Sequence, residues 1–109
     1  MKYKNLYAVR NSDFTSTFIL KNGDNSIKNL TGKTVSIKIA KHFESEIVNT
    51  FPLVVTEANS GHCSLTLTHD QINTIDGISN VYSMYVIDSV TGMNVIVLQG
   101  RFFIEDSVQ

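Results

Sequence analysis

Hydrophobic and polar residues alternate with a period of two along most of this chain, and that period is typical of β-strands with one buried face. Val35, Ile37 and Ile39 alternate with more polar neighbours, which predicts a half-buried strand with a wet outer face. Cys63, Leu65 and Leu67 alternate in the same way, so residues 62–67 form a second such strand. Each strand is expected to place its apolar side chains in a common core.

The same reasoning predicts further short strands separated by turn residues. They are expected at residues 3–9, 14–21, 47–56, 80–89, 94–99 and 101–105, with Gly100 interrupting the last two. In residues 14–21 the side chains of Phe14, Ser16, Phe18 and Leu20 share one face. Pro52 cannot donate a hydrogen bond to a neighbouring strand, so the strand at 47–56 is expected to lie at an edge or to bulge there.

One short helix is predicted at residues 68–75. Thr68 followed three positions later by Gln71 matches a capping box, in which each residue satisfies a backbone group of the other. Asp70 falls in the first turn, where the helix dipole favours a negative charge. Ile72 and Ile75 are three apart and share the face expected to be buried.

Together these elements predict an all-β protein, an antiparallel sandwich of about seven or eight strands with one short helix at about 68–75. A length of 109 residues favours one domain over residues 1–109. Hydrophobic residues make up 42% of the chain, yet no stretch is long and apolar enough to predict a transmembrane helix. The first seven residues lack the apolar centre of a signal peptide, so we expect a protein made and kept in a cytoplasm.

The net charge of −1 argues against a general nucleic-acid binder. The charges are unevenly distributed, with eight basic and four acidic side chains in residues 1–55, and one basic and six acidic in residues 56–109. One interpretation is a solvated surface on which the two halves interleave. The other is a dipolar module that packs against copies of itself or against a charged neighbour.

Residues that could carry chemistry are few. Cys63, the single cysteine, excludes an intrachain disulfide, and its phase with the neighbouring leucines predicts a buried, unreactive thiol. His62 and Cys63 would point to opposite faces of a strand, which disfavours a zinc site. Asp88, Glu105 and Asp106 could meet at a sheet end, but they lack the spacing of a calcium loop. No metal, no cofactor and no catalytic motif is predicted, so the chain is not expected to be an enzyme.

Most aromatic residues lie on predicted strands and are interpreted as core, while a few are candidates for contact with a partner. Phe103 follows Phe102 on one strand, so one of the two must face outward, and Phe43 lies in a charged loop. The candidate interface comprises Tyr3, Tyr7, Phe43, Phe51, Phe103, Lys38, Lys41 and Glu105. The absence of tryptophan disfavours a platform for stacking bases or sugars.

Several motifs occur in an order that resembles a known family. They are Asp13-Phe14-Thr15, Asn22-Gly23, Leu30-Thr31-Gly32, the strand from Gly61 to Thr68, the strand from Tyr82 to Asp88, and Leu98-Gln99-Gly100-Arg101-Phe102. This pattern resembles the immunoglobulin-like β-sandwich domains of tailed-bacteriophage structural proteins, and above all the N-terminal domain of baseplate upper proteins. The resemblance covers about residues 12–105 and implies an immunoglobulin-like fold.

The resemblance also implies a function. It favours a non-enzymatic virion structural protein of the tail, baseplate or neck that acts as an adaptor or assembly module. Its expected partners are other virion structural proteins, with self-association in a symmetric assembly and without nucleic acid or membrane; its expected location is the virion, after synthesis in the host cytoplasm. The alternatives are a capsid decoration protein and a carbohydrate- or surface-binding β-sandwich.

Overall fold

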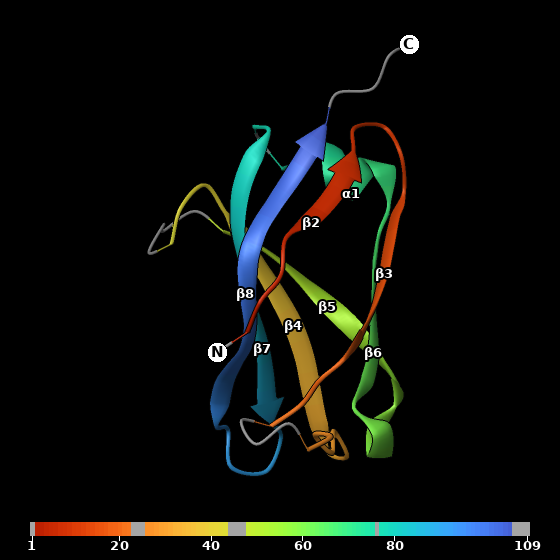
Figure 1. The fold of residues 1–109 in the computed structure, drawn as a ribbon, viewed down its shortest axis with the longest axis vertical. Helices are drawn as coiled ribbons and strands as arrows, with labels where there is room; N and C mark the ends of the chain where they lie inside the picture. The colour runs from red at the N-terminus through yellow and green to blue at the C-terminus, as the bar shows by residue number, and fades with distance from the viewer. Residues whose placement is uncertain (1, 23–25, 44–47, 76, 106–109) are drawn as a thin grey trace.

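The computed structural model describes residues 2–22, 26–43, 48–75 and 77–105, and these residues are mostly strands (Figure 1). The elements are β1 (Lys2–Tyr3), β2 (Leu6–Val9), β3 (Phe14–Ile19), β4 (Lys33–Ala40), β5 (Val48–Glu57), the 3-10 turn η1 (Ala58–Ser60), β6 (His62–Leu67), α1 (His69–Asn73), β7 (Ser79–Asp88) and β8 (Asn94–Glu105). The all-β prediction is confirmed. Strands lie in every region predicted from the alternation, although residues 3–9 form two strands and residues 94–105 form one.

The strands are hydrogen-bonded in the order β1-β8-β7-β4-β5-β6-β3, and β2 also pairs with β8. Strand β5 belongs to two layers, because its first part pairs with β4 up to Leu53 and its last part pairs with β6 from Val54. The first layer therefore contains β1, β2, β8, β7 and β4, and the second contains β6 and β3. The two layers face each other across the core and are joined along β5 (Figure 1).

Pro52 lies at the place where β5 passes from one layer to the other. It is opposite Ser36 of β4, and the pairing of β5 with β6 begins two residues later, at Val54. This part of β5 has a strand on one side only, so the prediction that Pro52 lies at an edge is confirmed. The irregularity in β5 is found further on, between Val55 and Glu57.

The two N-terminal strands pair with β8 in parallel, whereas the other strand pairs are antiparallel. The predicted single strand at 3–9 is divided into β1 and β2, and Lys4 and Asn5 lie between them. Alternation assigns the buried face of such a strand but not the direction of its neighbour. The sandwich is therefore mixed rather than purely antiparallel, and the N-terminal strands account for the difference.

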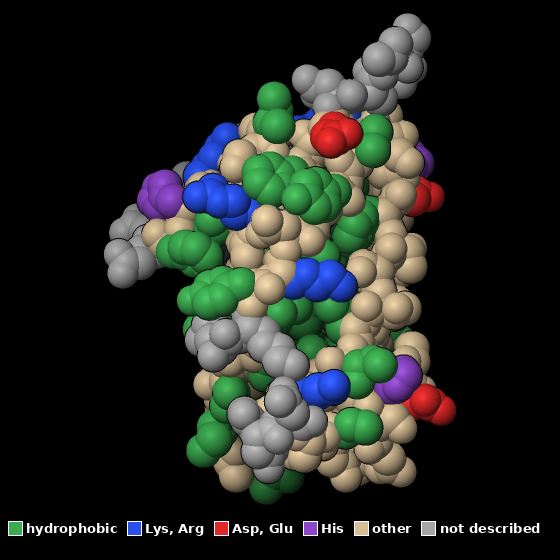
Figure 2. Space-filling view, in the orientation of Figure 1, with side chains coloured by type: hydrophobic (Ala, Val, Ile, Leu, Met, Phe, Trp, Pro, Cys, Tyr) green, Lys and Arg blue, Asp and Glu red, His purple; other side chains and the backbone are tan. Residues whose placement is uncertain are grey.

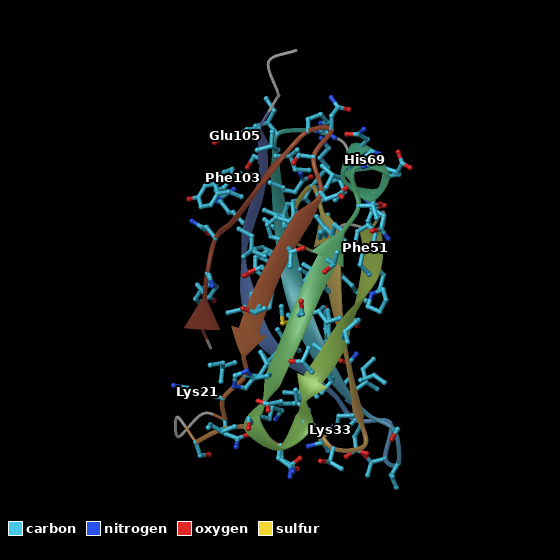
Figure 3. All side chains as sticks on the ribbon, turned by 90° about the vertical axis from the view of Figure 1, so that its right-hand side faces the viewer. Lys21, Lys33, Phe51, His69, Phe103 and Glu105 are labelled. Carbon is cyan, nitrogen blue, oxygen red and sulfur yellow. The ribbon has the colours of Figure 1, made fainter. Side chains whose placement is uncertain are left out.

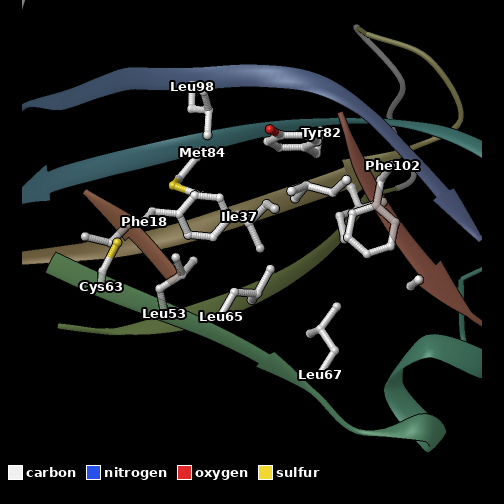
Figure 4. Close-up of a cluster of buried hydrophobic side chains, with 14 of the residues drawn as sticks. Phe18, Ile37, Leu53, Cys63, Leu65, Leu67, Tyr82, Met84, Leu98 and Phe102 are labelled. Atoms are coloured by element: carbon white, nitrogen blue, oxygen red, sulfur yellow. The ribbon is translucent and has the colours of Figure 1, made fainter. Parts of the chain in front are cut away.

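One cluster of buried side chains fills the space between the layers (Figure 4). Met84 and Leu98 project from the first layer, and Cys63 and Leu65 project from the second. The predicted phases are confirmed, since Cys63, Leu65 and Leu67 are almost fully buried and Thr66 is exposed. Burying a leucine-sized side chain contributes about 1.5–3 kcal/mol, so this cluster is the main source of stability.

Gly100 lies inside β8 and does not interrupt it, contrary to the prediction of two strands. A Cβ atom at this position would clash with the Lys4 carbonyl oxygen, so the missing side chain lets the N-terminal segment cross β8 closely. The same carbonyl oxygen accepts a hydrogen bond from the Tyr82 hydroxyl. Gly100 is therefore a packing position and not a strand break.

Helix α1 is shorter than the predicted 68–75 but is capped as expected. The Thr68 hydroxyl accepts from the Gln71 backbone N–H (3.2 Å), and the Gln71 side chain accepts from the Thr68 N–H (2.8 Å). Ile72 and Ile75 are both buried. The capping box and the buried face of the helix are confirmed.

Candidate interaction surface

In the described part of the chain, the side chains that commonly bind metal ions do not form a cluster. Residues 2–22, 26–43, 48–75 and 77–105 contain no group of three or more His, Cys, Asp or Glu side chains placed to hold a metal ion. Asp88 and Glu105 end β7 and β8, which are antiparallel, so they lie at opposite ends of the sheet and do not meet; Asp106 lies outside the described residues. No helix among the described residues is long and apolar enough to cross a membrane.

The surface that stands out is the outer face of the first layer. Its side chains come from odd-numbered positions of β1 and β2 and from alternate positions of β8, β7 and β4. The registers between these strands place them on the same face of the sheet. We call it the outer face, and it comprises Tyr3, Tyr7, Ser36, Lys38, Val81, Ser83, Tyr85, Gln99, Arg101, Phe103 and Glu105. Figure 2 views the side of the molecule where β2 and β8 lie in front, and it shows hydrophobic and basic side chains close together there.

A stacked aromatic pair is the centre of the upper half of this face. Tyr7 of β2 and Phe103 of β8 are register partners, and their rings are 5.3 Å apart at 18°. Tyr7 remains 60% exposed and Phe103 is half-buried beneath it. Tyr3, two register steps away on the same face, is 72% exposed. A stacked and exposed aromatic pair is a feature of surfaces that contact other proteins.

Side chains in the middle of the outer face have little solvent-accessible surface, although they lie on the outer side of the sheet. Val81 and Ser83 point outward and are nevertheless buried. The Lys38 ammonium lies 4.9 Å from the centre of the Tyr85 ring, in a cation–π contact, and the Gln99 amide donates to the Ser83 hydroxyl (3.0 Å). Long side chains laid flat across the strands thus exclude water from this region.

Charge is also organised on this face. Lys38 and Arg101 lie along its middle, and Glu105 is exposed at the end of β8. Asp88, at the other end, accepts from the backbone N–H groups of Val90 (2.8 Å) and Thr91 (3.2 Å). These bonds lower the pKa of Asp88 and tie its carboxylate to the hairpin turn. The Asp88 carboxylate therefore stabilises the hairpin turn. Glu105 is the carboxylate that the outer face exposes to solvent.

The structure brings most of the predicted interface residues together, with three exceptions. Phe51 is in register with Ile37, packs half-buried against the core, and lies apart from Phe103 (Figure 3). Phe43 is 47% exposed, and both Phe43 and Lys41 follow the end of β4 rather than lying within the sheet face. The candidate surface is thus centred on Tyr3, Tyr7 and Phe103, with Lys38 and Glu105 on the same face.

Sequence reasoning missed a second feature, a groove lined by Lys4, Ile19 and Lys21 between β1 and β3. One feature of the sequence is consistent with this groove. Ile19 is an apolar residue on the outward face of β3, where Thr15 and Thr17 are its neighbours. An outward isoleucine indicates a surface that is not simply solvated.

Comparison with known proteins shows what this fold is similar to. No family model and no curated protein matches this sequence. Among solved structures, the fold is similar to that of the N-terminal domain of phage TP901-1 ORF48, with a TM-score of 0.62 over 94% of this chain and 85% of that chain. The sequence identity is 9%, so the likeness establishes the fold. The predicted resemblance to a bacteriophage protein domain is confirmed at that level.

Proposed function

We propose that this protein is a non-enzymatic structural component of a bacteriophage virion, acting as an adaptor or assembly module in the tail, baseplate or neck. The observation that carries the proposal is its fold, which is similar to the N-terminal domain of a phage protein along nearly all of this chain. The sequence motifs that resemble phage structural domains point the same way. A fold alone hosts many functions, so the surface must supply the second argument.

That second argument is the outer face. Tyr7 and Phe103 offer a stacked aromatic anchor, Lys38 and Arg101 add positive charge, and Glu105 adds negative charge at one end. Aromatic and arginine side chains supply most of the binding energy in protein interfaces. A rigid sandwich with such a face would join its neighbours in a symmetric assembly without any chemical step.

The experiment compares incorporation of the protein into phage particles with and without the Tyr7–Phe103 pair. Phage particles carrying Tyr7→Ser together with Phe103→Ser are purified and tested for the protein by immunoblot, and the free protein is measured by light scattering over a wide concentration range at low and high salt. We expect the double variant to be lost from particles while remaining folded. Val54→Ser, at an exposed apolar position of the second layer, is the matched control and should be retained.

Two results would overturn the proposal. Retention of the double variant in particles at the normal copy number would remove the outer face from assembly. Absence of the wild-type protein from purified particles would remove the virion role itself. A wild-type protein that is present in particles but monomeric at every concentration would transfer the assignment to a decoration protein docked on a pre-existing lattice.

A further inference from the structure

A groove lies where the sheet fails to close, between β3 at one edge and the β1–β8 pair at the other. We call it the edge groove, and it has a volume of about 540 Å³. Its lining includes Lys4, Thr17, Ile19, Lys21 and Val97. Figure 2 shows a hollow with hydrophobic side chains inside it and a Lys or Arg side chain on either side. Phe18, Leu20 and Leu98 form the buried floor.

Strand β3 presents an open backbone edge to this groove. Among the described residues it pairs with β6 alone, and the Leu20 N–H donates to the Gly61 carbonyl oxygen (2.9 Å). In an antiparallel pair the residues bonded to the neighbour alternate, so Phe18 bonds to β6 while Thr17 and Ile19 direct their backbone N–H and C=O groups away from it. Those groups face the groove.

The opposite side of the groove is open as well. Strand β1 pairs with β8 only from Leu98 onward, so in the described structure residues 94–97 of β8 have β7 as their one strand partner. Natural proteins protect exposed edges with charges, prolines or bulges. The sequences of β3 (Phe14–Ile19) and of residues 94–97 contain no charged residue and no proline. The register of β8 with β7 shifts at Val97, so this edge contains a bulge or similar irregularity. The edge of β3 has none of these protecting features in its pairing with β6 and is therefore open to pairing.

Charge determines which strand fits. Lys4 and Lys21 line the groove, and no carboxylate among the described residues lines it. The Lys4 ammonium lies 5.3 Å from the centre of the Phe18 ring. Because both charged lining residues are basic, an incoming segment with carboxylates near its ends is complementary. Its alternate side chains must be apolar, to lie on Phe18 and Leu98.

We propose that the edge groove binds an extended, acidic segment of a partner protein by β-strand addition. The segment pairs with the free edge of β3 and closes the gap to β8, places alternate apolar side chains on the floor, and sets its carboxylates against Lys4 and Lys21. This contact is independent of the aromatic pair on the outer face, so the two can succeed or fail separately.

The test uses a fluorescein-labelled peptide, Asp-Thr-Val-Thr-Val-Thr-Asp with blocked ends, titrated with the full chain and followed by fluorescence anisotropy and by ¹⁵N chemical shifts. We expect saturable binding with shifts at Thr17, Ile19 and Val97. Lys4→Glu together with Lys21→Glu should weaken binding about tenfold or more, because the complementary charges become repulsive. A peptide with lysine in place of both aspartates should bind the double variant better than the wild type.

Two controls separate strand addition from attraction between charges. Lys41→Glu changes an exposed lysine outside the groove and should leave binding within about twofold. Thr17→Pro removes a backbone N–H that faces the groove without breaking a bond to β6, so the fold should persist and binding should be lost. The same peptide with proline in place of its central threonine should not bind.

The proposal is overturned if the peptide does not bind, if the proline peptide binds equally well, or if the shifts lie outside the groove. It is also overturned if the free chain forms a dimer that the double charge reversal dissociates, because the occupant is then a second copy. Peptide binding is measured on the isolated chain, so its outcome does not depend on whether the protein enters virions.

Discussion

The Tyr82 hydroxyl donates a hydrogen bond to the Lys4 carbonyl oxygen (2.5 Å), linking β7 to the junction between β1 and β2 across 78 residues. Tyr82 is almost fully buried, and burial raises its pKa to about 12 because the charged phenolate is disfavoured there. The hydroxyl therefore remains protonated and available as a donor. Gly100 completes the arrangement, because only a residue without Cβ lets the Lys4 carbonyl reach this position.

The first prediction concerns this link. Gly100→Ala should lower the free energy of unfolding by about 1–3 kcal/mol, because the new methyl group must displace the Lys4 backbone. Tyr82→Phe should lower it by about 1 kcal/mol through loss of one hydrogen bond. Urea denaturation gives both values. Tyr85→Phe, on the outer face, is the control and should change stability by less; equal losses for both tyrosines would refute the role of Tyr82.

The second prediction concerns Cys63, which is 1% exposed between the layers. Burial raises the pKa of its thiol to about 11, because the thiolate is poorly solvated there. At about pH 8 a thiol reagent should therefore react with the folded protein far more slowly than with protein unfolded in urea. The rate of absorbance change with a disulfide reagent measures this. Comparable rates in the two states would show that the sulfur is accessible.

Local pattern determined most of this fold. The strand at 62–67 was predicted to the residue, because alternation and the preceding turn at Gly61 agree. The capping box at Thr68 was equally local. What local pattern could not supply was the partner of each strand: the parallel pairing of β2 with β8 joins segments almost a chain length apart. Gly100 was misinterpreted for the same reason, since the Lys4 backbone it accommodates is distant in sequence.

The same distinction between local pattern and long-range pairing applies to the candidate site. Tyr7 and Phe103 were each predicted from their position on a strand, but their stacking depends on the β2–β8 register. The side of β5 on which Phe51 lies could not be predicted, because it depends on the pairing of Phe51 with Ile37. The edge groove was not predicted at all, because it exists only where two sheet edges fail to meet.

A third prediction concerns pH. The Asp13 carboxylate accepts from both the backbone N–H (2.7 Å) and the ring Nδ1 (2.9 Å) of His69. The hydrogen bond to Asp13, with the nearby Asp70 charge, raises the pKa of His69 above its usual 6.5, and the bonds from His69 lower the pKa of Asp13 below its usual 3.8. Protonated His69 and ionised Asp13 therefore both favour the folded state.

The sign of each shift defines the expected profile. The His69 contribution is complete below about pH 6.5 and is lost as pH rises through the higher folded pKa, and the Asp13 contribution is lost as pH falls below about 3.8. Urea midpoints between about pH 5.5 and 8 should therefore fall in the wild type more than in Asp13→Asn, which keeps an oxygen acceptor without the charge. Parallel profiles for the two proteins would exclude the pair as their source.

The last prediction concerns the other end of helix α1, where a side chain replaces the missing backbone partners. The Arg10 guanidinium donates to the carbonyl oxygens of Ile72 (3.0 Å), Ile75 (2.9 Å) and Gly77 (3.1 Å). Arg10→Met keeps the apolar stem but leaves these acceptors without their donor, at a cost of about 1–3 kcal/mol. Thr68→Ala, which removes only the N-terminal cap, should cost about 1 kcal/mol.

Hydrogen exchange distinguishes the two variants beyond their total stability. Arg10→Met should speed exchange at residues 72–75, because Arg10 links β2 to the end of the helix and its loss frees both. Thr68→Ala should speed exchange mainly at Gln71, whose N–H loses its acceptor. If Arg10→Met proves no more costly than Thr68→Ala, the helix is held by the burial of Ile72 and Ile75 alone, and the long-range contact adds little to it.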